Sequence, residues 1–395
     1  MTPHLEDDGS PLVVHVIPSP RGRGAQRAAR VLVDRLNEPG VARHCLLGLF
    51  DGPPEVAIDL ALWVGGGSRA AEGFDLRYAL RLRKVLAQLR PAAVVAHGGD
   101  AMKYALPAVI GTRCPLAYCV IGTYAGSPTR LHEGLWKRIM AHADLVVAVG
   151  DEVLDECTKR FRVDPRRAVV IPNGRDPSQF HPRSEPGGGT HATLIFVGAL
   201  TPQKQPERFI EVVRCLRANA RPVRAVMVGD GPLAGTLGPL AAADGVELLG
   251  PRSDVPDLLR HSDLFVFTSL PTGEGMPGVL IEAGLSGLPV VSTAVPGAAT
   301  VLCNGRTGVI VDDSVAAMAG AVAELLDNAD RRVAMGLSAR TRCESEFNLD
   351  LMAQRWRNAL ADIQTGTARS GALGAARRAI AFRRAKRSRR RSSQT

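Results

Sequence analysis

Short apolar runs alternate with longer segments of helical periodicity along most of the chain, and this alternation restricts the fold more than any other feature. Runs of Val, Ile, Leu and Ala are typical of strands buried on both faces of a parallel sheet. We expect strands at residues 12–17, 44–49, 93–96, 116–121, 145–149 and 168–171, and at 193–197, 223–228, 247–249, 264–267, 289–292 and 308–311. The pattern predicts an α/β protein with two doubly wound, Rossmann-like domains.

The length of 395 residues exceeds a single ordinary core, so two domains are expected. The stretch from Pro182 to Thr190 is rich in Pro, Gly and Ser and is typical of a hinge. We therefore predict a first domain at 1–182, a hinge at 183–190, a second domain at 191–345, an amphipathic helix at 346–366 and a basic tail at 367–395. A ligand cleft between the two domains, closing when ligand binds, follows from this organisation.

Seven scattered cysteines include no C-x-x-C pair and none near His at metal-ligand spacing, which indicates reduced thiols in a cytoplasmic protein without a metal site. The first expected strand begins at Leu12, after an acidic segment, so a signal peptide is not expected. No apolar run is long enough for a membrane helix, and any membrane contact is expected to be peripheral.

The positive charge is concentrated in the tail. From Arg369 to Thr395 there are nine Arg, one Lys and no acidic residue, whereas the whole chain has 49 basic and 39 acidic residues. The remainder is therefore formally neutral. The tail is either a disordered, solubilising extension or a segment that adheres to an anionic membrane surface. Nucleic acid is a less favoured partner, because Phe382 is the only aromatic residue of the tail.

The segment from Pro271 to Pro296 carries most of the functional information. An apolar, strand-like run, residues 264–268, precedes it, and the segment itself reads as a glycine-rich loop followed by a helix. It places Glu274 and Glu282 with seven residues between them. A glycine-rich loop that leads into a helix presents free N–H groups and a positive dipole end, which suits a diphosphate. The two carboxylates then lie on either side of a phosphate site.

Further motifs occur in order along the chain. Ile195 to Lys204 is an apolar strand that ends in a turn at Gly198 and is followed by a basic residue; Val226 to Leu233 is a strand with a Gly-Asp-Gly-Pro turn. Val169 to Pro182 contains Ile-Pro-Asn-Gly-Arg-Asp, His97 ends the strand of the Val94 to Asp100 segment, and Arg21 to Arg27 is a glycine-containing loop after the first strand.

Together these motifs resemble retaining glycosyltransferases of family 4, whose signature is E-x7-E. The resemblance covers about residues 12–363 and implies the GT-B fold, with a last helix that crosses back to the first domain. It also implies that Glu274 binds hydroxyls of the donor sugar, that Glu282 binds the ribose, and that Lys204 and the backbone of Gly275, Met276, Pro277, Gly278 and Val279 bind the phosphates. Gly198 and Gly24 then belong to donor-facing loops, and His97 lies near the reacting sugar.

Some positions depart from the family pattern. Ala199 follows Gly198 where the family usually has Arg, so one of two cations for the diphosphate is missing. Arg21, Arg23 and Arg306 are unranked candidates to replace it. Arg23 also stands in place of a glycine, and Gln26 in place of an acid, in the loop that faces the acceptor.

The resemblance implies a retaining, metal-independent hexosyltransferase that needs no cofactor. Its co-substrate is a nucleotide diphosphate sugar, with UDP or GDP favoured, and its acceptor is a hydroxyl of a glycan, a lipid-linked sugar or a small molecule. The expected mechanism is front-side attack, in which the acceptor proton passes to the donor phosphate and neither glutamate acts as nucleophile. A nucleotide-sugar epimerase of the same fold and a non-catalytic protein that binds sugar nucleotides or polysaccharide remain alternatives.

Overall fold

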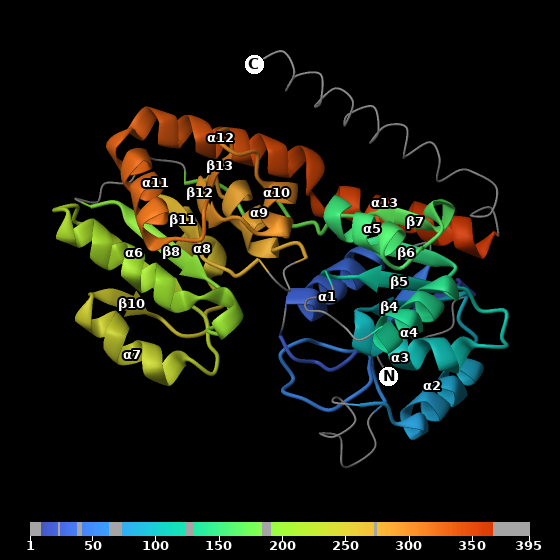
Figure 1. Cartoon of the computed structure of the whole chain (residues 1–395). Coiled ribbons are helices and arrows are strands. Elements are labelled where there is room, and N and C mark those ends of the chain that lie inside the picture. The colour runs from blue at the N-terminus through green and yellow to red at the C-terminus, as the bar shows by residue number, and fades with distance from the viewer. Residues whose placement is uncertain are drawn as a thin grey trace. The chain divides into compact units, whose positions relative to one another are not determined.

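The computed structural model describes residues 9–22, 24–37, 42–62, 73–123, 130–183, 191–271 and 275–365. Two compact units, each built around one sheet, make up the chain (Figure 1). Unit 1 comprises Met1–Ile121, Ser127–Ile171 and Ala353–Thr395, and unit 2 comprises Gly122–Gly126 and Pro172–Met352. The main passage from unit 1 to unit 2 falls between Ile171 and Pro172.

Unit 1 contains a seven-stranded parallel sheet with the order β3-β2-β1-β4-β5-β6-β7. Its strands are β1 (Leu12–Ile17), β2 (Arg43–Gly48), β3 (Leu60–Ala61), β4 (Ala93–His97), β5 (Leu116–Val120), β6 (Leu145–Ala148) and β7 (Ala168–Val170). Its helices are α1 (Gly24–Leu36), α2 (Leu76–Leu89), α3 (Gly99–Val109), α4 (Arg130–Ala141), α5 (Asp151–Lys159) and most of α13 (Leu349–Gln364).

Unit 2 contains a six-stranded parallel sheet with the order β10-β9-β8-β11-β12-β13. Its strands are β8 (Thr193–Val197), β9 (Arg224–Val228), β10 (Val246–Leu248), β11 (Leu264–Phe267), β12 (Val290–Thr293) and β13 (Gly308–Val311). Its helices are α6 (Pro206–Ala218), α7 (Ala234–Ala243), α8 (Val255–Arg260), α9 (Gly278–Leu285), α10 (Pro296–Val301), α11 (Val315–Asp327) and α12 (Ala329–Glu346).

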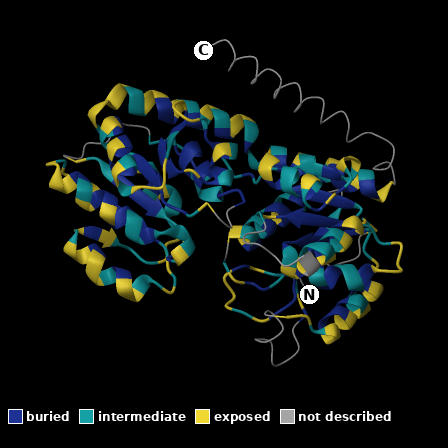
Figure 2. Ribbon diagram, in the orientation of Figure 1, coloured by how far each residue is buried: buried dark blue, intermediate teal, exposed yellow. Residues whose placement is uncertain are grey.

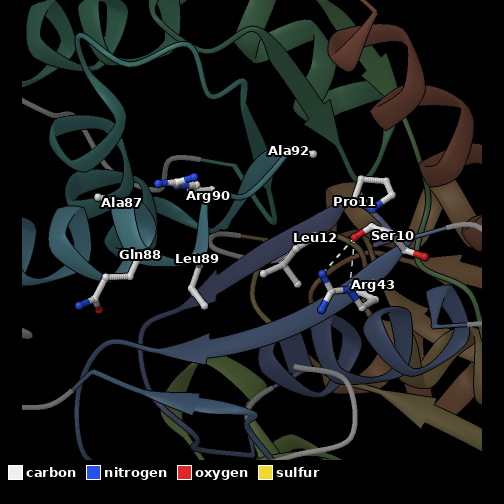
Figure 3. Close-up of a pocket in the computed structure, with 9 residues that line it drawn as sticks. All are labelled: Ser10, Pro11, Leu12, Arg43, Ala87, Gln88, Leu89, Arg90 and Ala92. Carbon is white, nitrogen blue, oxygen red and sulfur yellow. Dashed lines mark hydrogen bonds between the residues drawn. The ribbon is translucent and has the colours of Figure 1, made fainter. Parts of the chain in front are cut away.

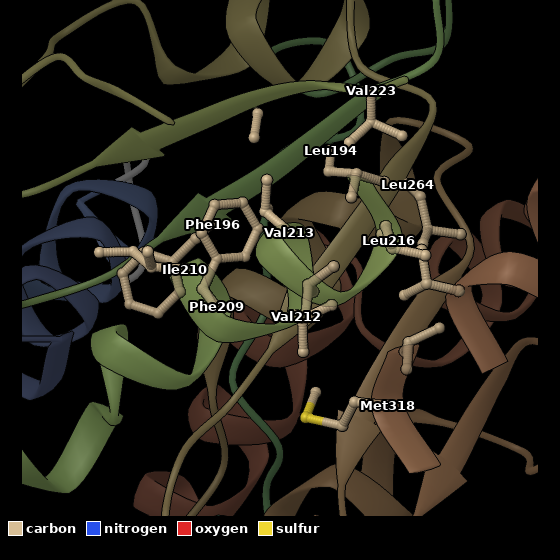
Figure 4. Close-up of a cluster of buried hydrophobic side chains, with 14 of the residues drawn as sticks. Leu194, Phe196, Phe209, Ile210, Val212, Val213, Leu216, Val223, Leu264 and Met318 are labelled. Carbon is tan, nitrogen blue, oxygen red and sulfur yellow. The ribbon is translucent and has the colours of Figure 1, made fainter. Parts of the chain in front are cut away.

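The strands are buried on both faces because helices cover both sides of each sheet. Figure 2 shows the strands in the colour of buried residues and the exposed residues mainly on the outer sides of the helices. In unit 2, side chains of β8 such as Leu194 and Phe196 pack against Phe209 and Val213 of α6 (Figure 4). The apolar side chains of α11 join the same core through Met318. Near-continuous apolar strands therefore become the centre of two doubly wound sheets, as predicted.

Two glycines after β9 allow loops to approach one another closely. Gly229 has φ +141°, and a Cβ placed there would collide with the carbonyl oxygen of Gly198. A Cβ on Gly231 would collide with the backbone of Leu200. The Gly-Asp-Gly turn thus keeps the loops after β8 and β9 in contact, so its glycines are explained by backbone packing.

None of the seven cysteines, all of which lie among the described residues, forms a disulfide bond. Burial raises the pKa of the Cys119 and Cys343 thiols to about 12, which keeps both protonated. None of the helices in the described part of the chain combines the length and apolar character that a bilayer-crossing helix needs.

Candidate functional site

Each sheet has one point at which the direction of strand addition reverses. In unit 1 this point lies between β1 and β4, and in unit 2 between β8 and β11. In open α/β sheets, ligands bind beyond the carboxyl ends of the strands at such a point, because the two flanking loops diverge there. The loops after β1 and β4 and those after β8 and β11 are therefore the candidate binding regions, and they contain the predicted site residues.

In unit 2, Lys204 follows β8 and ends the short 3-10 helix Pro202–Lys204. The buried Thr268, directly after β11, donates its hydroxyl to the carbonyl of Lys204 at 2.7 Å. The Leu270 N–H donates to the carbonyl of Gln203 at 2.8 Å. The Lys204 Nζ lies 5.4 Å from the centroid of the Phe267 ring. These contacts join the two loops and hold the ammonium group at the carboxyl edge of β11.

The second loop leads into α9, which begins at Gly278 after Pro277. The first N–H groups of a helix have no acceptor within it, and the dipole is positive at that end. Gly275, Met276 and Pro277 are buried; the Met276 side chain turns inward, and its Sδ lies 3.3 Å from the backbone nitrogen of Asn173. Any contact of Met276 with a ligand is therefore through its backbone.

Glu282 lies one turn into α9 and forms an ion pair that sequence reasoning did not anticipate. The Arg175 Nε donates to its Oε1 at 2.6 Å, and the two side chains are only 14% and 16% exposed. A Cβ on Gly278 would collide with the Arg175 guanidinium, so this group lies along the face of α9 between its first turn and Glu282. Backbone bonds of Arg175 to Phe347 and Leu349 fix its position.

The ion pair gives the Glu282 side chain a defined orientation. A charge-assisted bond to an Arg that is itself held by the backbone restricts the rotamers of the Glu282 side chain. The second carboxylate oxygen can still accept hydrogen bonds from hydroxyl groups. Arg175 also brings a cation next to the start of α9.

In unit 1, His97 ends β4 and belongs to a row of three buried histidines. The His97 Nε2 lies 2.9 Å from His15 Nδ1, and the His15 Nε2 lies 3.0 Å from His44 Nδ1. The strand register places all three on the same face of the sheet. His44 pairs with Val13, which is two residues before His15, and His15 pairs with Val95, which is two residues before His97. The Trp356 ring of α13 lies against this face, with centroids 6.2 Å from His97 and 6.5 Å from His15. Although His97 is the last residue of its strand, it is only 5% exposed.

The row fixes the tautomers of its members together. Burial lowers the pKa of His97 and His44 to about 4, with the Arg357 charge adding to the shift of His44, and burial lowers the pKa of His15 well below its ordinary value. All three rings are therefore neutral near pH 7. Because each neutral ring has one N–H and one lone pair, both hydrogen bonds run in the same direction along the row. The proton on His97 Nδ1 thus depends on His44, two strands away.

Gly24 and Gln26 follow β1, the second strand of the switch point in unit 1. Gly24 begins α1 and is exposed, and a Cβ added there would have no heavy atom within 4 Å. Gln26 is buried, and its Oε1 has no hydrogen-bond partner among the described residues. A buried, unsatisfied acceptor requires an explanation, and a ligand group beyond the end of β1 would supply one.

A pocket of about 660 Å³ lies elsewhere on unit 1. Its lining includes Ser10, Leu12 and Ala92, at the amino ends of β1 and β4, and the end of α2 around Arg90 (Figure 3). Arg43 donates there to the carbonyl of Ser10 (Figure 3). This pocket is at the opposite edge of the sheet from the candidate region, so we do not assign it to the site. Within the described residues, no three His, Cys, Asp or Glu side chains form a group that could hold a metal ion.

Among the residues predicted in unit 2, Gly198 and Lys204 follow β8, whereas Gly275–Val279 and Glu282 follow β11. These two strands are neighbours in the sheet. Glu274 lies outside the described residues, as does Arg23. Arg306 precedes β13 and is therefore at the amino edge of the sheet, which makes it a poor replacement for the missing arginine. The residue that sequence reasoning missed is Arg175. It belongs to the Ile-Pro-Asn-Gly-Arg-Asp segment. The signal available in the sequence was a basic residue in this motif of a chain that has Ala199 where the resemblance leads one to expect Arg.

Two family models match the chain. The model described as Glycosyltransferase Family 4 matches residues 22–179, and the model described as Glycosyl transferases group 1 matches residues 191–328. Together they cover most of both units.

The chain is also similar in sequence to individual glycosyltransferases. The chain is 30% identical over 221 residues to the UDP-Gal:alpha-D-GlcNAc-diphosphoundecaprenol alpha-1,3-galactosyltransferase of Escherichia coli, which covers 52% of this chain and 56% of that protein. It is 26% identical over 316 residues to a GDP-mannose-dependent alpha-(1-6)-phosphatidylinositol monomannoside mannosyltransferase of Mycobacterium tuberculosis, covering 73% and 79%. The match thus spans little more than half of the first relative.

Among solved structures, the chain resembles Anabaena HepE in complex with UDP and glucose. The TM-score is 0.73 and the identity 18%, and the match covers 88% of this chain and 99% of the other. With two parallel, doubly wound sheets, this likeness confirms the predicted GT-B fold.

Proposed function

Because this chain belongs to the glycosyltransferases of group 1 and family 4, we propose that it is a retaining, metal-independent enzyme that transfers a hexosyl unit from a nucleoside diphosphate sugar to a hydroxyl acceptor. One observation carries the proposal. In unit 2, a lysine loop and a helix N-terminus follow the two strands of the switch point, and a carboxylate held by an arginine lies one turn further along that helix.

These groups match the parts of a nucleoside diphosphate. Lys204 and the first N–H groups of α9 suit the two phosphates, and the Glu282 carboxylate suits the ribose hydroxyls. As the bond to the sugar breaks, negative charge develops on the departing diphosphate, where a fixed ammonium group and a helix dipole stabilise it most. Arg175 holds Glu282 in place and adds a cation at the same end of the helix.

The proposed reaction is front-side displacement at the anomeric carbon. The acceptor hydroxyl attacks from the side of the leaving group and passes its proton to a donor phosphate oxygen, so no protein nucleophile is needed. In this proposal Glu274 binds the donor sugar, and His97 contributes a ring whose tautomer is set by His15 and His44. A fixed tautomer presents one defined hydrogen-bonding group to the sugar.

The names of the relatives support the donor and acceptor classes. The E. coli relative is named for UDP-Gal and a diphosphoundecaprenol acceptor, and the mycobacterial relative for GDP-mannose and a phosphatidylinositol mannoside. We therefore propose a UDP- or GDP-linked hexose as donor and a lipid-linked or glycan hydroxyl as acceptor, with the protein acting at the inner face of the membrane. Metal independence rests mainly on Lys204 and the α9 dipole as the charges that face the diphosphate.

A binding panel tests the donor site before any acceptor is known. UDP, GDP, ADP, TDP and their common sugar conjugates are added to the wild type, to Glu282→Gln and to Glu247→Gln, with and without a metal chelator. Glu247, on the edge strand β10, pairs with Arg224 of β9 and serves as the matched control. A ligand at about 100 times its Kd stabilises the fold by about 2.7 kcal/mol, which thermal denaturation detects readily.

We expect one nucleotide family to stabilise the wild type and Glu247→Gln in chelator, and to have little effect on Glu282→Gln. No stabilisation by any nucleotide would contradict the donor site, and a requirement for metal would contradict metal independence. With the donor identified, NMR of the glycosylated product reports the anomeric configuration; inversion would refute the retaining mechanism. A free, altered sugar nucleotide as the product would indicate an epimerase instead.

A further inference from the structure

The turn that carries Lys204 has a backbone conformation that its surroundings must hold. Gln205, the next residue, has φ 47° and ψ 52°, in the left-handed region that residues other than glycine rarely adopt. Such a conformation is strained and persists only where neighbouring contacts stabilise it. Across the turn, the Gln205 Nε2 donates to the carbonyl of Pro202 at 2.8 Å. The position of Lys204 therefore depends on the groups around Gln205.

Arg208, in the first turn of α6, supplies such a group. Its side chain is only 13% exposed. Its Nη2 donates to the Oε1 of Gln205 at 3.4 Å, and its Nη1 donates to the carbonyl of Thr268 at 3.3 Å. Thr268 is the buried residue whose hydroxyl donates to the carbonyl of Lys204. The guanidinium thus contacts the residue after Lys204 in the chain and the residue that binds the Lys204 backbone.

An ion pair with Asp313 holds the same guanidinium from a third loop. Asp313 follows the carboxyl end of β13, and the two contacts described above lie after β8 and β11. Phe209, beside Arg208 on α6, and Met318 of α11 belong to one buried cluster, so α6 and the helix that follows Asp313 are packed together (Figure 4). Arg208 therefore links three loops at the carboxyl edge of the sheet in unit 2.

We propose that Arg208 is a positioning residue for Lys204: its pair with Asp313 holds the Lys204 turn so that the ammonium group faces the donor diphosphate. This inference rests on the proposed function and extends it to residues that do not touch the donor. Ala199 stands where the family resemblance places an arginine, so accurate placement of the remaining cation matters more. A lysine side chain is flexible, and a group on a loop is held accurately only by the contacts around it. Because its charge is paired with Asp313, Arg208 adds little field at the diphosphate and acts through the turn.

The test is calorimetric titration of the full-length protein with UDP and GDP, and with uridine and guanosine, which lack the phosphates. Arg208→Met and Asp313→Asn each remove one partner of the pair, and each is made alone and together with Lys204→Met. The matched control is Arg214→Met, which lies on the same helix and breaks the exposed pair with Asp244.

For the diphosphate that binds the wild type, we expect Arg208→Met and Asp313→Asn to weaken affinity about tenfold, because the ammonium group is no longer held in place. The affinity for the free nucleoside should not change. In the Lys204→Met background neither variant should weaken diphosphate binding further, because both act through Lys204. Arg208→Lys should restore part of the affinity, since its ammonium group can still pair with Asp313. Arg214→Met should bind as the wild type does.

The outcomes separate this inference from the proposed function. If neither UDP nor GDP binds the wild type, or if Lys204→Met binds them unchanged, the proposed donor site is wrong and the inference with it. If Lys204→Met weakens binding, the inference alone is overturned when Arg208→Met binds the diphosphate like the wild type, or when its effect adds to that of Lys204→Met. Equal losses for nucleoside and diphosphate would also overturn it, because they indicate a general structural role.

Thermal melting and circular dichroism show whether each variant is folded. If Arg208→Met does not fold, Asp313→Asn carries the test, because the Asp313 side chain is 48% exposed and its replacement leaves the core unchanged.

Discussion

Acidification should destabilise unit 1 through its buried histidines. His97 and His44 have folded-state pKa values of about 4, and burial is the main cause of both shifts. His15, between them, has its pKa lowered well below 6.5 by burial and then by the charges of His97, His44 and Arg30. In the unfolded chain all three titrate near pH 6.5. Between about pH 6.5 and 4 the unfolded state therefore binds more protons, and stability is lost as the pH falls.

The size of the effect follows from the two pKa values. For one histidine with pKa 6.5 unfolded and about 4 folded, moving from pH 8 to pH 5 removes about 2 kcal/mol of stability. His97 and His44 together give about 4 kcal/mol, and His15 adds to the loss in the same direction. This is a large fraction of the 5–15 kcal/mol typical of a folded protein.

Urea denaturation followed by intrinsic fluorescence can measure this loss in unit 1 alone. The chain has three tryptophans, at positions 63, 136 and 356, and all belong to the residue ranges of unit 1. We expect the free energy of unfolding to fall by about 4 kcal/mol or more from pH 8 to pH 5 in the wild type. In His97→Gln the fall should be about 2 kcal/mol smaller, because one buried titrating group is gone.

The control is His142→Gln, which changes an exposed histidine of the same unit and should keep the wild-type pH dependence. The reasoning is refuted if wild type and His97→Gln lose the same stability between pH 8 and pH 5, or if stability rises on acidification.

Three further predictions concern unit 2. Arg175→Met should weaken nucleotide binding about tenfold or more, because a charge-assisted bond to Glu282 is lost; calorimetric titration with the nucleotide that stabilises the wild type measures this. The control Arg214→Met breaks the exposed pair with Asp244 and should leave nucleotide affinity unchanged. Lys204→Met should lower kcat for sugar transfer about 100-fold with the chelator present, and a variant with full activity would remove Lys204 from the phosphate site. Gly231→Ala should lower the free energy of unfolding by about 2 kcal/mol or more, because its Cβ collides with the backbone of Leu200. The control Gly235→Ala, in open space on α7, should raise the free energy of unfolding by about 0.5–1 kcal/mol. Equal urea midpoints for the two variants would contradict the packing argument.

The fold was largely predictable because its signal is local. Buried parallel strands are apolar along their whole length, so β1, β8, β11 and β13 appear at the expected residues, and the other expected strands shift by one residue or so at their ends. The exception is β3, Leu60–Ala61, which the sequence did not indicate. Two residues are too few to show any periodicity, and this strand exists only because β2 offers an edge for pairing.

The candidate site was predictable only where it follows the strand ends. Lys204 lies on the loop that follows β8, and Gly275–Val279 spans the end of the loop after β11 and the start of α9. Because β8 and β11 are neighbours in the sheet, the two loops leave the same edge side by side. The Arg175–Glu282 pair joins residues 107 positions apart, and the His15–His97 bond joins residues 82 apart. No local pattern carries such contacts. His15 and His44 each interrupt an apolar strand, and that interruption was their only trace in the sequence.

The Arg175–Glu282 pair also changes how the loss at Ala199 should be understood. An arginine that is already paired with a carboxylate contributes little net field at a distance, so Arg175 does not replace the missing cation in full. Under the proposed function, the diphosphate then depends mainly on Lys204 and on the amides of α9 for charge, whereas Arg175 chiefly determines the orientation of Glu282. Adding a cation by Ala199→Arg should therefore restore phosphate affinity lost in Lys204→Met but not ribose recognition lost in Arg175→Met. Binding of a nucleoside diphosphate and of the free nucleoside to the two double variants separates these roles, and equal rescue of both would show that Arg175 acts on the phosphates directly.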